Sequence, residues 1–196
     1  MKLPVKKSIA IVADGPSAMA LRYITIPQNI YVIGVNHASI WLPRCDAYIT
    51  CFPDHRQRFL MNNQRQGVRY FAAVPPSYGS VFSKGDLYGP RERNVTFFTR
   101  SEHIYGMSVD PEKINGGNSA WAALGLAYHM KAERVGLFGV DGNNKVRVSG
   151  GKPCLPDLQD IFSSYDGKAE IINGSMNSSV KCFPQATATV ALEWLL

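Results

Sequence analysis

Short apolar runs alternate with more polar segments along most of the chain. The first run, Ile9-Ala10-Ile11-Val12, is rich in β-branched residues and short enough for a strand buried on both faces. Similar runs recur, and each ends at a polar or turn-forming residue. We therefore expect further strands at 29–36, 46–52, 68–74, 95–99, 134–140 and 169–172.

Segments with helical character lie between these runs. The clearest covers 119–131, where Trp121, Leu124 and Tyr128 recur at i, i+3 and i+7 beside a face of alanines. Shorter helices are expected from Ala18, capped by Ser17, and at 37–42, 54–66 and 186–196, whereas 101–115 has the composition of a loop.

This alternation predicts an α/β chain with a Rossmann-like three-layer fold and a mostly parallel sheet. The sequence has no internal repeat, and no composition change marks a domain boundary. We therefore expect a single domain over 1–196, with long loops at about 75–94 and 142–156.

Polar residues follow several of the predicted strands. In open parallel sheets ligands bind beyond the carboxyl ends of the strands, which places Asp14, Asn36, Phe52 and Asp141 near one edge. That edge is where we expect the functional site.

The turn Asp14-Gly15-Pro16-Ser17 links the first strand to the first predicted helix. Backbone N–H groups at such a turn can bind a phosphate, with Gly15 and Ser17 as contacts. The alternative is an ordinary turn, for which Gly and Ser are also favoured. A carboxylate a few ångströms from a phosphate is repulsive by about 1 kcal/mol in water. We therefore expect Asp14 to contact a ribose hydroxyl, a base or a divalent cation.

A second turn of this kind precedes the clearest helix. Gly116, Gly117, Asn118 and Ser119 leave free N–H groups and little side-chain bulk, which favours a nearby anion or carbonyl. The alternative is a plain N-cap supplied by Asn118 or Ser119. Together the two turns outline a site long enough for a nucleotide.

Two further residues are candidates for chemistry at this edge. Asp141 directly follows a buried strand, where it can bind magnesium or orient an acceptor hydroxyl, or simply bond to its own turn. Among the histidines, His37 adjoins Asn36 and is the candidate for acid–base work. His129 lies within the clearest helix and is expected to be structural.

The composition narrows the class of partner. A formal charge of +6 and a pI near 9.2 favour anionic partners. The basic residues are scattered and lack an RNA-binding aromatic signature, so we expect a small-molecule nucleotide rather than nucleic acid. The composition does not identify the acceptor substrate, and it is compatible with a homo-oligomer.

The cysteines and the N-terminal segment bear on localisation. The chain has no CxxC pair, no apolar segment typical of a signal peptide and no run long enough to span a membrane. We therefore expect a reduced, cytoplasmic protein. The four cysteines are Cys45, Cys51, Cys154 and Cys182.

Three stretches and the tail, in this order, resemble two related groups of proteins. The stretches are IVADGPS at 11–17, VIGVN at 32–36 and GGNSAWAALGLAYHMKAERVGLFGVDG at 116–142, and the tail is INGSMNSSVKCFPQATATVALEWL at 172–195. One group is the bacterial cell-surface sialyltransferases. The other is the archaeal hydroxymethylpterin pyrophosphokinase-like proteins, which share the Gly-Pro-Ser opening. The likeness covers most of the chain.

The first resemblance implies a glycosyltransferase-like enzyme with a nucleotide-activated donor. In those enzymes the equivalents of Gly15, Ser17, Asn36, Gly117, Asn118 and Ser119 contact the nucleotide. Their leaving-group tyrosines are replaced here by a loop in which Lys145 or Arg147 is expected to stabilise a departing phosphate. Their late catalytic histidine has no counterpart in 175–184.

The second resemblance implies ATP- and magnesium-dependent pyrophosphoryl transfer, with Asp14 and Asp141 as metal ligands. A third interpretation is a nucleotide-binding or interaction protein that has kept the fold without the chemistry. The chain is short for either group, so the acceptor-binding segment is expected to be reduced or supplied by a partner subunit.

Overall fold

The computed structural model describes residues 3–77, 94–142, 145–151 and 158–196. Its described strands form one parallel sheet of eight strands. These are β1 (Ser8–Val12), β2 (Tyr31–Val35), β3 (Ala47–Thr50), β4 (Arg69–Val74), β5 (Val95–Ser101), β6 (Lys113–Asn115), β7 (Arg134–Phe138) and β8 (Glu170–Asn173). The predicted fold class, α/β with a Rossmann-like three-layer architecture, is confirmed.

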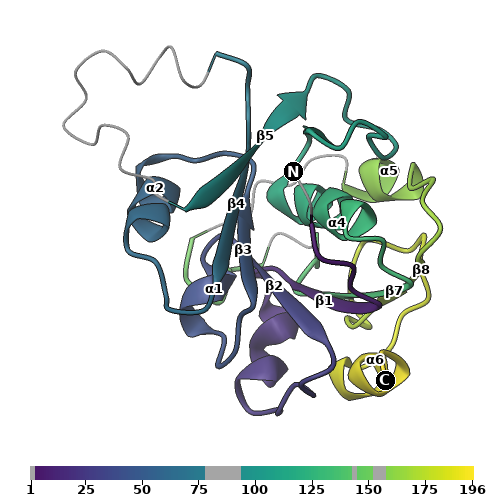
Figure 1. Ribbon diagram of the computed structural model, residues 1–196. Helices are drawn as coiled ribbons and strands as arrows, with labels where there is room; N and C mark the ends of the chain where they lie inside the picture. Colours follow the sequence, from purple (N-terminus) through teal and green to yellow (C-terminus); the bar gives the residue numbers. More distant parts are fainter. Residues whose placement is uncertain (1–2, 78–93, 143–144, 152–157) are drawn as a thin grey trace.

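The helices cover both faces of this sheet (Figure 1). They are η1 (Pro16–Arg22, a 3-10 helix), α1 (Ala38–Trp41), α2 (His55–Asn62), α4 (Ser119–His129), α5 (Leu158–Ser163) and α6 (Ala188–Trp194). Helices α4 and α5 pack on one face with Ile9, Ile11 and Ile33. Helices η1, α1 and α6 pack on the other with Ala10 and Val12.

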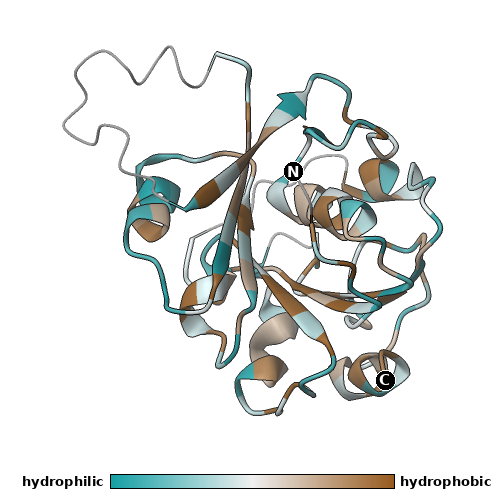
Figure 2. Ribbon diagram, in the orientation of Figure 1, coloured by the Kyte–Doolittle hydropathy of each residue, from teal (hydrophilic) through white to brown (hydrophobic). Residues whose placement is uncertain are grey.

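Burial on both faces explains why the central strands are continuous apolar runs. Ile9, Ala10, Ile11 and Val12 of β1 are all fully buried. Figure 2 shows hydrophobic residues concentrated along the central strands and hydrophilic residues along the connecting segments. Trp121 of α4 is also almost fully buried and meets Phe162 of α5 edge to face, with ring centroids 5.2 Å apart.

The strand order β6-β5-β4-β3-β2-β1-β7-β8 determines where a site can form. The chain leaves β1 toward β2 and continues outward to β6. It then returns through α4 to β7 on the other side of β1. The strand order therefore reverses at β1, and in open α/β sheets ligands bind beside such a reversal, beyond the carboxyl ends of the strands.

Two local predictions are corrected by the structure, and one helix is added. Ser17 does not cap a helix from Ala18, because the 3-10 helix starts at Pro16 with Gly15 as N-cap. The expected loop at 101–115 contains β6, which extends the edge of the sheet. Helix α5 lies in a stretch for which the sequence pattern indicated no element.

Other predictions fall partly or wholly outside the described residues. Most of the long loop expected at 75–94 does so, as do parts of the loop expected at 142–156, including Cys154. The described cysteines, Cys45, Cys51 and Cys182, are free thiols. None of the described helices is long and apolar enough to span a membrane.

Candidate functional site

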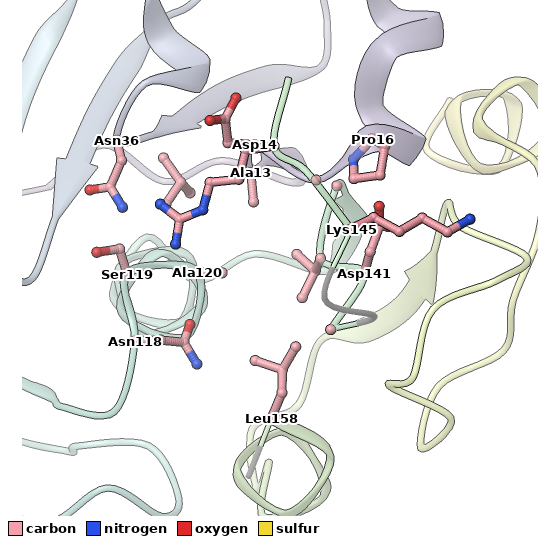
Figure 3. Close-up of a pocket in the computed structure, with 16 residues that line it drawn as sticks. Ala13, Asp14, Pro16, Asn36, Asn118, Ser119, Ala120, Asp141, Lys145 and Leu158 are labelled. Atoms are coloured by element: carbon pink, nitrogen blue, oxygen red, sulfur yellow. The ribbon is translucent and has the colours of Figure 1, made fainter. Parts of the chain in front are cut away.

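A small pocket of about 80 Å³ opens at the carboxyl edge of the sheet, beside β1. We call it the switch-point pocket. Its walls come from the segments that follow β1, β2 and β7, from the first turn of α4, and from Leu158 at the start of α5 (Figure 3). It therefore lies where the reversal of strand order predicts a ligand.

Asp141, three residues after the end of β7, ties that strand to η1. Its side chain is 3% exposed, and Oδ2 accepts a hydrogen bond from the Ser17 backbone N–H at 2.9 Å. The Ser17 hydroxyl donates to Oδ1 of the same carboxylate and accepts from the Gly139 N–H at 3.2 Å. The Ser17 N–H and hydroxyl, which the sequence suggested as phosphate contacts, thus already donate to the Asp141 carboxylate.

Gly15 has a packing role in the same junction. Its N–H donates to the Gly139 carbonyl at 3.0 Å. A Cβ at position 15 would lie 2.4 Å from that carbonyl oxygen and 2.7 Å from Oδ2 of Asp141. The absent side chain therefore lets the two strand ends approach closely, and a phosphate at Gly15 or Ser17 would have to displace these internal bonds.

Asp14 is also buried, with 8% of its surface exposed. Its Oδ1 accepts from the Trp41 indole N–H at 2.9 Å, and its Oδ2 accepts from the Ser149 hydroxyl. The Val148 N–H donates to the Asp14 carbonyl at 2.9 Å. Residues 145–151, which we call the strap, are therefore fastened to the end of β1.

Asp14 and Asp141 are the predicted metal ligands, and each carboxylate already accepts two internal hydrogen bonds. A divalent cation held by both would have to compete with those donors. Among the residues that the structure describes, no group of three or more His, Cys, Asp or Glu side chains converges as a metal site. The donor set therefore does not favour a cation held by the protein alone.

The first turn of α4 forms the wall opposite Asp141. Asn118 is the N-cap, and its Oδ1 accepts from the Trp121 N–H at 2.8 Å. The next two N–H groups, of Ser119 and Ala120, have no intrahelical acceptor, as is general for a first turn. Both residues line the pocket. The positive end of the dipole of this eleven-residue helix therefore faces the cavity.

Ser119 and Cys51 fix α4 against the end of β3. The Ser119 hydroxyl accepts from the Cys51 N–H at 3.1 Å. Burial raises the pKa of the Cys51 thiol to about 12, so the thiol stays protonated at neutral pH. Gly116 and Gly117, in contrast, do not line the pocket: the Gly116 N–H donates to the His103 carbonyl at 3.2 Å.

Asn36 supplies an unused polar atom to the pocket. It follows β2 with a left-handed backbone (φ 53°), which asparagine tolerates better than most residues. This turn lets its N–H donate to the Ile49 carbonyl at 3.1 Å. Its side-chain Oδ1 is buried and has no hydrogen-bond partner in the described part of the chain.

The strap contributes the basic residues. Arg147 and Lys145 both line the pocket. In Figure 3 the Lys145 side chain extends away from Asn36 and Ser119. Arg147 is half-buried, which makes it the stronger of the two predicted phosphate contacts.

Two residues that were predicted for the site at this edge of the sheet do not line the switch-point pocket. His37 is the N-cap of α1 and lines a separate groove beside α2. Phe52 is 51% exposed, does not line the pocket, and has the Arg100 guanidinium 4.7 Å from its ring centroid. The His129 Nε2–H donates to the Lys113 carbonyl at 2.8 Å, and the ring stacks on Phe98, which agrees with the structural role expected for it.

Sequence reasoning missed the partners that occupy the two carboxylates. Trp41 and Ser149 lie 27 and 135 positions from Asp14, and Ser17 lies 124 positions from Asp141. No spacing rule connects such pairs. The composition of the turns after β1 and β7 indicated that the two strand ends lie close together. It did not indicate which side chains are hydrogen-bonded there.

Comparison of the chain with protein-family models, with curated proteins and with solved structures finds no match. The switch-point pocket is therefore the feature of this protein that bears on its function.

Proposed function

We propose that the protein binds the phosphate of a nucleotide-activated donor in the switch-point pocket and acts as a glycosyltransferase-like transferase. The observation that carries the proposal is the position of the pocket. It opens at the reversal of strand order, and the first turn of α4 and Arg147 line it.

The size of the pocket limits what enters it. Pockets for complete small-molecule ligands typically hold about 300–1,000 Å³, whereas this one holds about 80 Å³. That volume suits a phosphate group rather than a whole nucleotide. The proposal therefore places the phosphate inside, against the N–H groups of Ser119 and Ala120, and the sugar and base outside or under a displaced strap.

The residues of the pocket suit a departing nucleotide. In the proposed reaction an acceptor hydroxyl passes its proton to the His37 imidazole, the acid–base group predicted from the sequence, and its oxygen bonds to the sugar carbon. The bond from that carbon to the phosphate oxygen breaks, and the electron pair stays on the phosphate. Arg147 and the α4 dipole stabilise the growing negative charge, and the unpaired Oδ1 of Asn36 accepts from a ribose hydroxyl.

Isothermal titration calorimetry with CMP, CDP, UDP, ADP and GDP tests the proposal, with and without magnesium. A charge-assisted hydrogen bond contributes about 1.5–3 kcal/mol, so Arg147→Gln should weaken binding by about tenfold or more. Lys7→Gln removes one charge from a side chain that is 80% exposed and should change affinity by less than about twofold. Absence of binding by every nucleotide, or equal affinity in Arg147→Gln, would contradict the proposal.

Magnesium enters this proposal as a counter-ion carried by the nucleotide phosphates. The titrations with magnesium also bear on the pyrophosphokinase-like alternative. In that alternative AMP is released from ATP in the presence of magnesium and an acceptor. Release of UDP or CMP from a nucleotide sugar would count against that alternative.

A second candidate function is nucleotide binding without transfer. It is favoured by the position of His37, the predicted acid–base residue, which lines the other groove and not the switch-point pocket. Tight nucleotide binding with no release of nucleotide from any nucleotide sugar would support it. Turnover lost in His37→Gln, with nucleotide affinity unchanged, would refute it.

A further inference from the structure

The groove beside α2 is the larger hollow at this edge of the sheet. We call it the α2 groove; it has a volume of about 810 Å³. His37 and Ile40 line one side, and α2 and the residues before it line the other. Because His37 directly follows Asn36 of the switch-point pocket, both hollows lie beyond the carboxyl end of β2.

Basic side chains outnumber acidic ones among the described residues that line the α2 groove. Arg56 and Arg58 are the basic residues, and Asp54 is the acidic one. The Asp54 carboxylate is the N-cap of α2 and accepts from the backbone N–H groups of Arg56 at 2.9 Å and Gln57 at 3.0 Å. Arg58 is only 7% exposed and already makes an interaction within the protein, so the exposed Arg56 is the arginine that a ligand can reach.

Two histidines add donors without adding negative charge. His37 and His55 line the groove from opposite sides, one from the start of α1 and one from the start of α2. Arginine and histidine N–H groups are suited to carboxylate and phosphate oxygens. The polar half of the groove therefore favours an anion.

The other half of the groove is apolar and accessible. Phe59 is 65% exposed and Ile40 is 57% exposed, and both line it together with Leu60. Exposed aromatic and aliphatic side chains gathered in a concave site are characteristic of a surface that binds the body of a ligand. A ligand that uses both halves carries an anionic group on an apolar or ring-shaped body.

We propose that the α2 groove binds the acceptor substrate, a small molecule with a carboxylate or phosphate attached to a ring. The acceptor role rests on the proposed transferase function. Binding of such an anion in the groove can be tested without assuming that function. The volumes support a division between the two hollows: about 810 Å³ lies within the range for a whole ligand, and about 80 Å³ does not. His37, at the junction, is then on the acceptor side of the reaction.

Phenyl phosphate is the probe, because it joins a ring to a phosphate dianion; phenol and inorganic phosphate represent each half alone. In an NMR titration of the labelled full chain, phenyl phosphate should shift His37 and His55 resonances before those of Ser119. It should bind more tightly than either half. Arg56→Gln should weaken its binding about tenfold, and Phe59→Ala should weaken it about threefold.

Two matched control variants remove a positive charge or an aromatic ring from positions that do not line the α2 groove. Lys7→Gln removes an exposed positive charge and Tyr23→Ala removes a ring that is 84% exposed; each should leave the affinity unchanged within about twofold. Phenyl carboxylate (benzoate) in place of phenyl phosphate distinguishes the two kinds of anion. Perturbation confined to Ser119 and its neighbours, or equal binding by phenyl phosphate and inorganic phosphate, would overturn the proposal.

The nucleotide and phenyl phosphate titrations together distinguish failure of the α2-groove proposal from failure of the transferase proposal. If nucleotides bind near α4 but no probe perturbs His37 or His55, the acceptor site is wrong and the proposed function stands. If phenyl phosphate binds in the groove but no nucleotide binds the protein, the anion site stands and the transferase proposal is wrong.

Discussion

Replacing Asp141 by alanine should strongly destabilise the protein. The carboxylate is 3% exposed and accepts from both the N–H and the hydroxyl of Ser17. Hydrogen bonds to charged groups contribute about 1.5–3 kcal/mol each, so Asp141→Ala should lower the free energy of unfolding by about 3–6 kcal/mol. Since domains are stable by only about 5–15 kcal/mol, that loss is a large fraction of the whole.

Urea unfolding followed by tryptophan fluorescence measures this loss. Asp141→Asn keeps an acceptor and the side-chain volume, so it should lose about half as much as Asp141→Ala. Ser17→Ala removes only the hydroxyl and its bond to the carboxylate, and should cost about 1.5–3 kcal/mol. Because the two residues are bonded directly, the double variant should cost less than the sum of the single variants by about 1 kcal/mol or more.

Asp160→Ala is the matched control, because Asp160 is an exposed acidic residue on α5. It should change the free energy of unfolding by less than about 0.5 kcal/mol. A loss below about 1 kcal/mol for Asp141→Ala would refute the structural role assigned to Asp141. Activity lost in Asp141→Ala would report lost stability first, so Ser17→Ala is the better probe of this junction.

Three further predictions concern the core and the strand ends. Gly139→Ala should cost more than about 2 kcal/mol, because φ is +69° and the new Cβ would lie 2.5 Å from the Ala13 carbonyl oxygen. In urea unfolding, Gly67→Ala shares the positive φ but meets nothing within 4 Å, so it should cost clearly less. Under native conditions iodoacetamide should alkylate exposed Cys182 well before buried Cys45 and Cys51, as followed by peptide mass spectrometry. The free energy of unfolding should fall as pH rises above about 9 under reducing conditions, since burial raises the pKa of Cys51 from 9.0 to about 12.

The sign of the alkaline effect follows from linkage. Between pH 9.0 and about 12 the unfolded chain has released the thiol proton that the folded chain retains. The folded state then binds more protons, so stability declines with rising pH. Stability that rises across this range would contradict the assignment, as would equal alkylation rates for the three thiols or equal costs for the two glycine variants.

The hydrophobic pattern predicted much of the fold, because strands buried on both faces appear in the sequence as continuous apolar runs. β1, β2, β3, β4 and β7 were all expected within a few residues of their bounds. β6 was missed because it is only three residues long, Lys113–Asn115, and it begins with an exposed lysine at the edge of the sheet. Pairing with β5, rather than its own composition, determines that it is a strand.

The site was predictable in its location but not in its bonding. The strand ends placed Asp14, Asn36 and Asp141 at one edge, and all three line the switch-point pocket. The sequence could not indicate that Ser17 would bond to Asp141, because that contact joins residues 124 positions apart. Likewise His37 adjoins Asn36 in sequence, yet the left-handed turn at Asn36 precedes a helix start that carries His37 to the α2 groove.

In the proposed function a nucleotide phosphate binds at the first turn of α4. Titration of the ¹⁵N-labelled protein with CDP, UDP, ADP and GDP, followed through the backbone amide signals, tests this binding. We expect the Ser119 and Ala120 amides to shift first and furthest, and Arg147→Gln to weaken the response. Shifts confined to other parts of the protein, or no shifts with any of the four nucleotides, would contradict it.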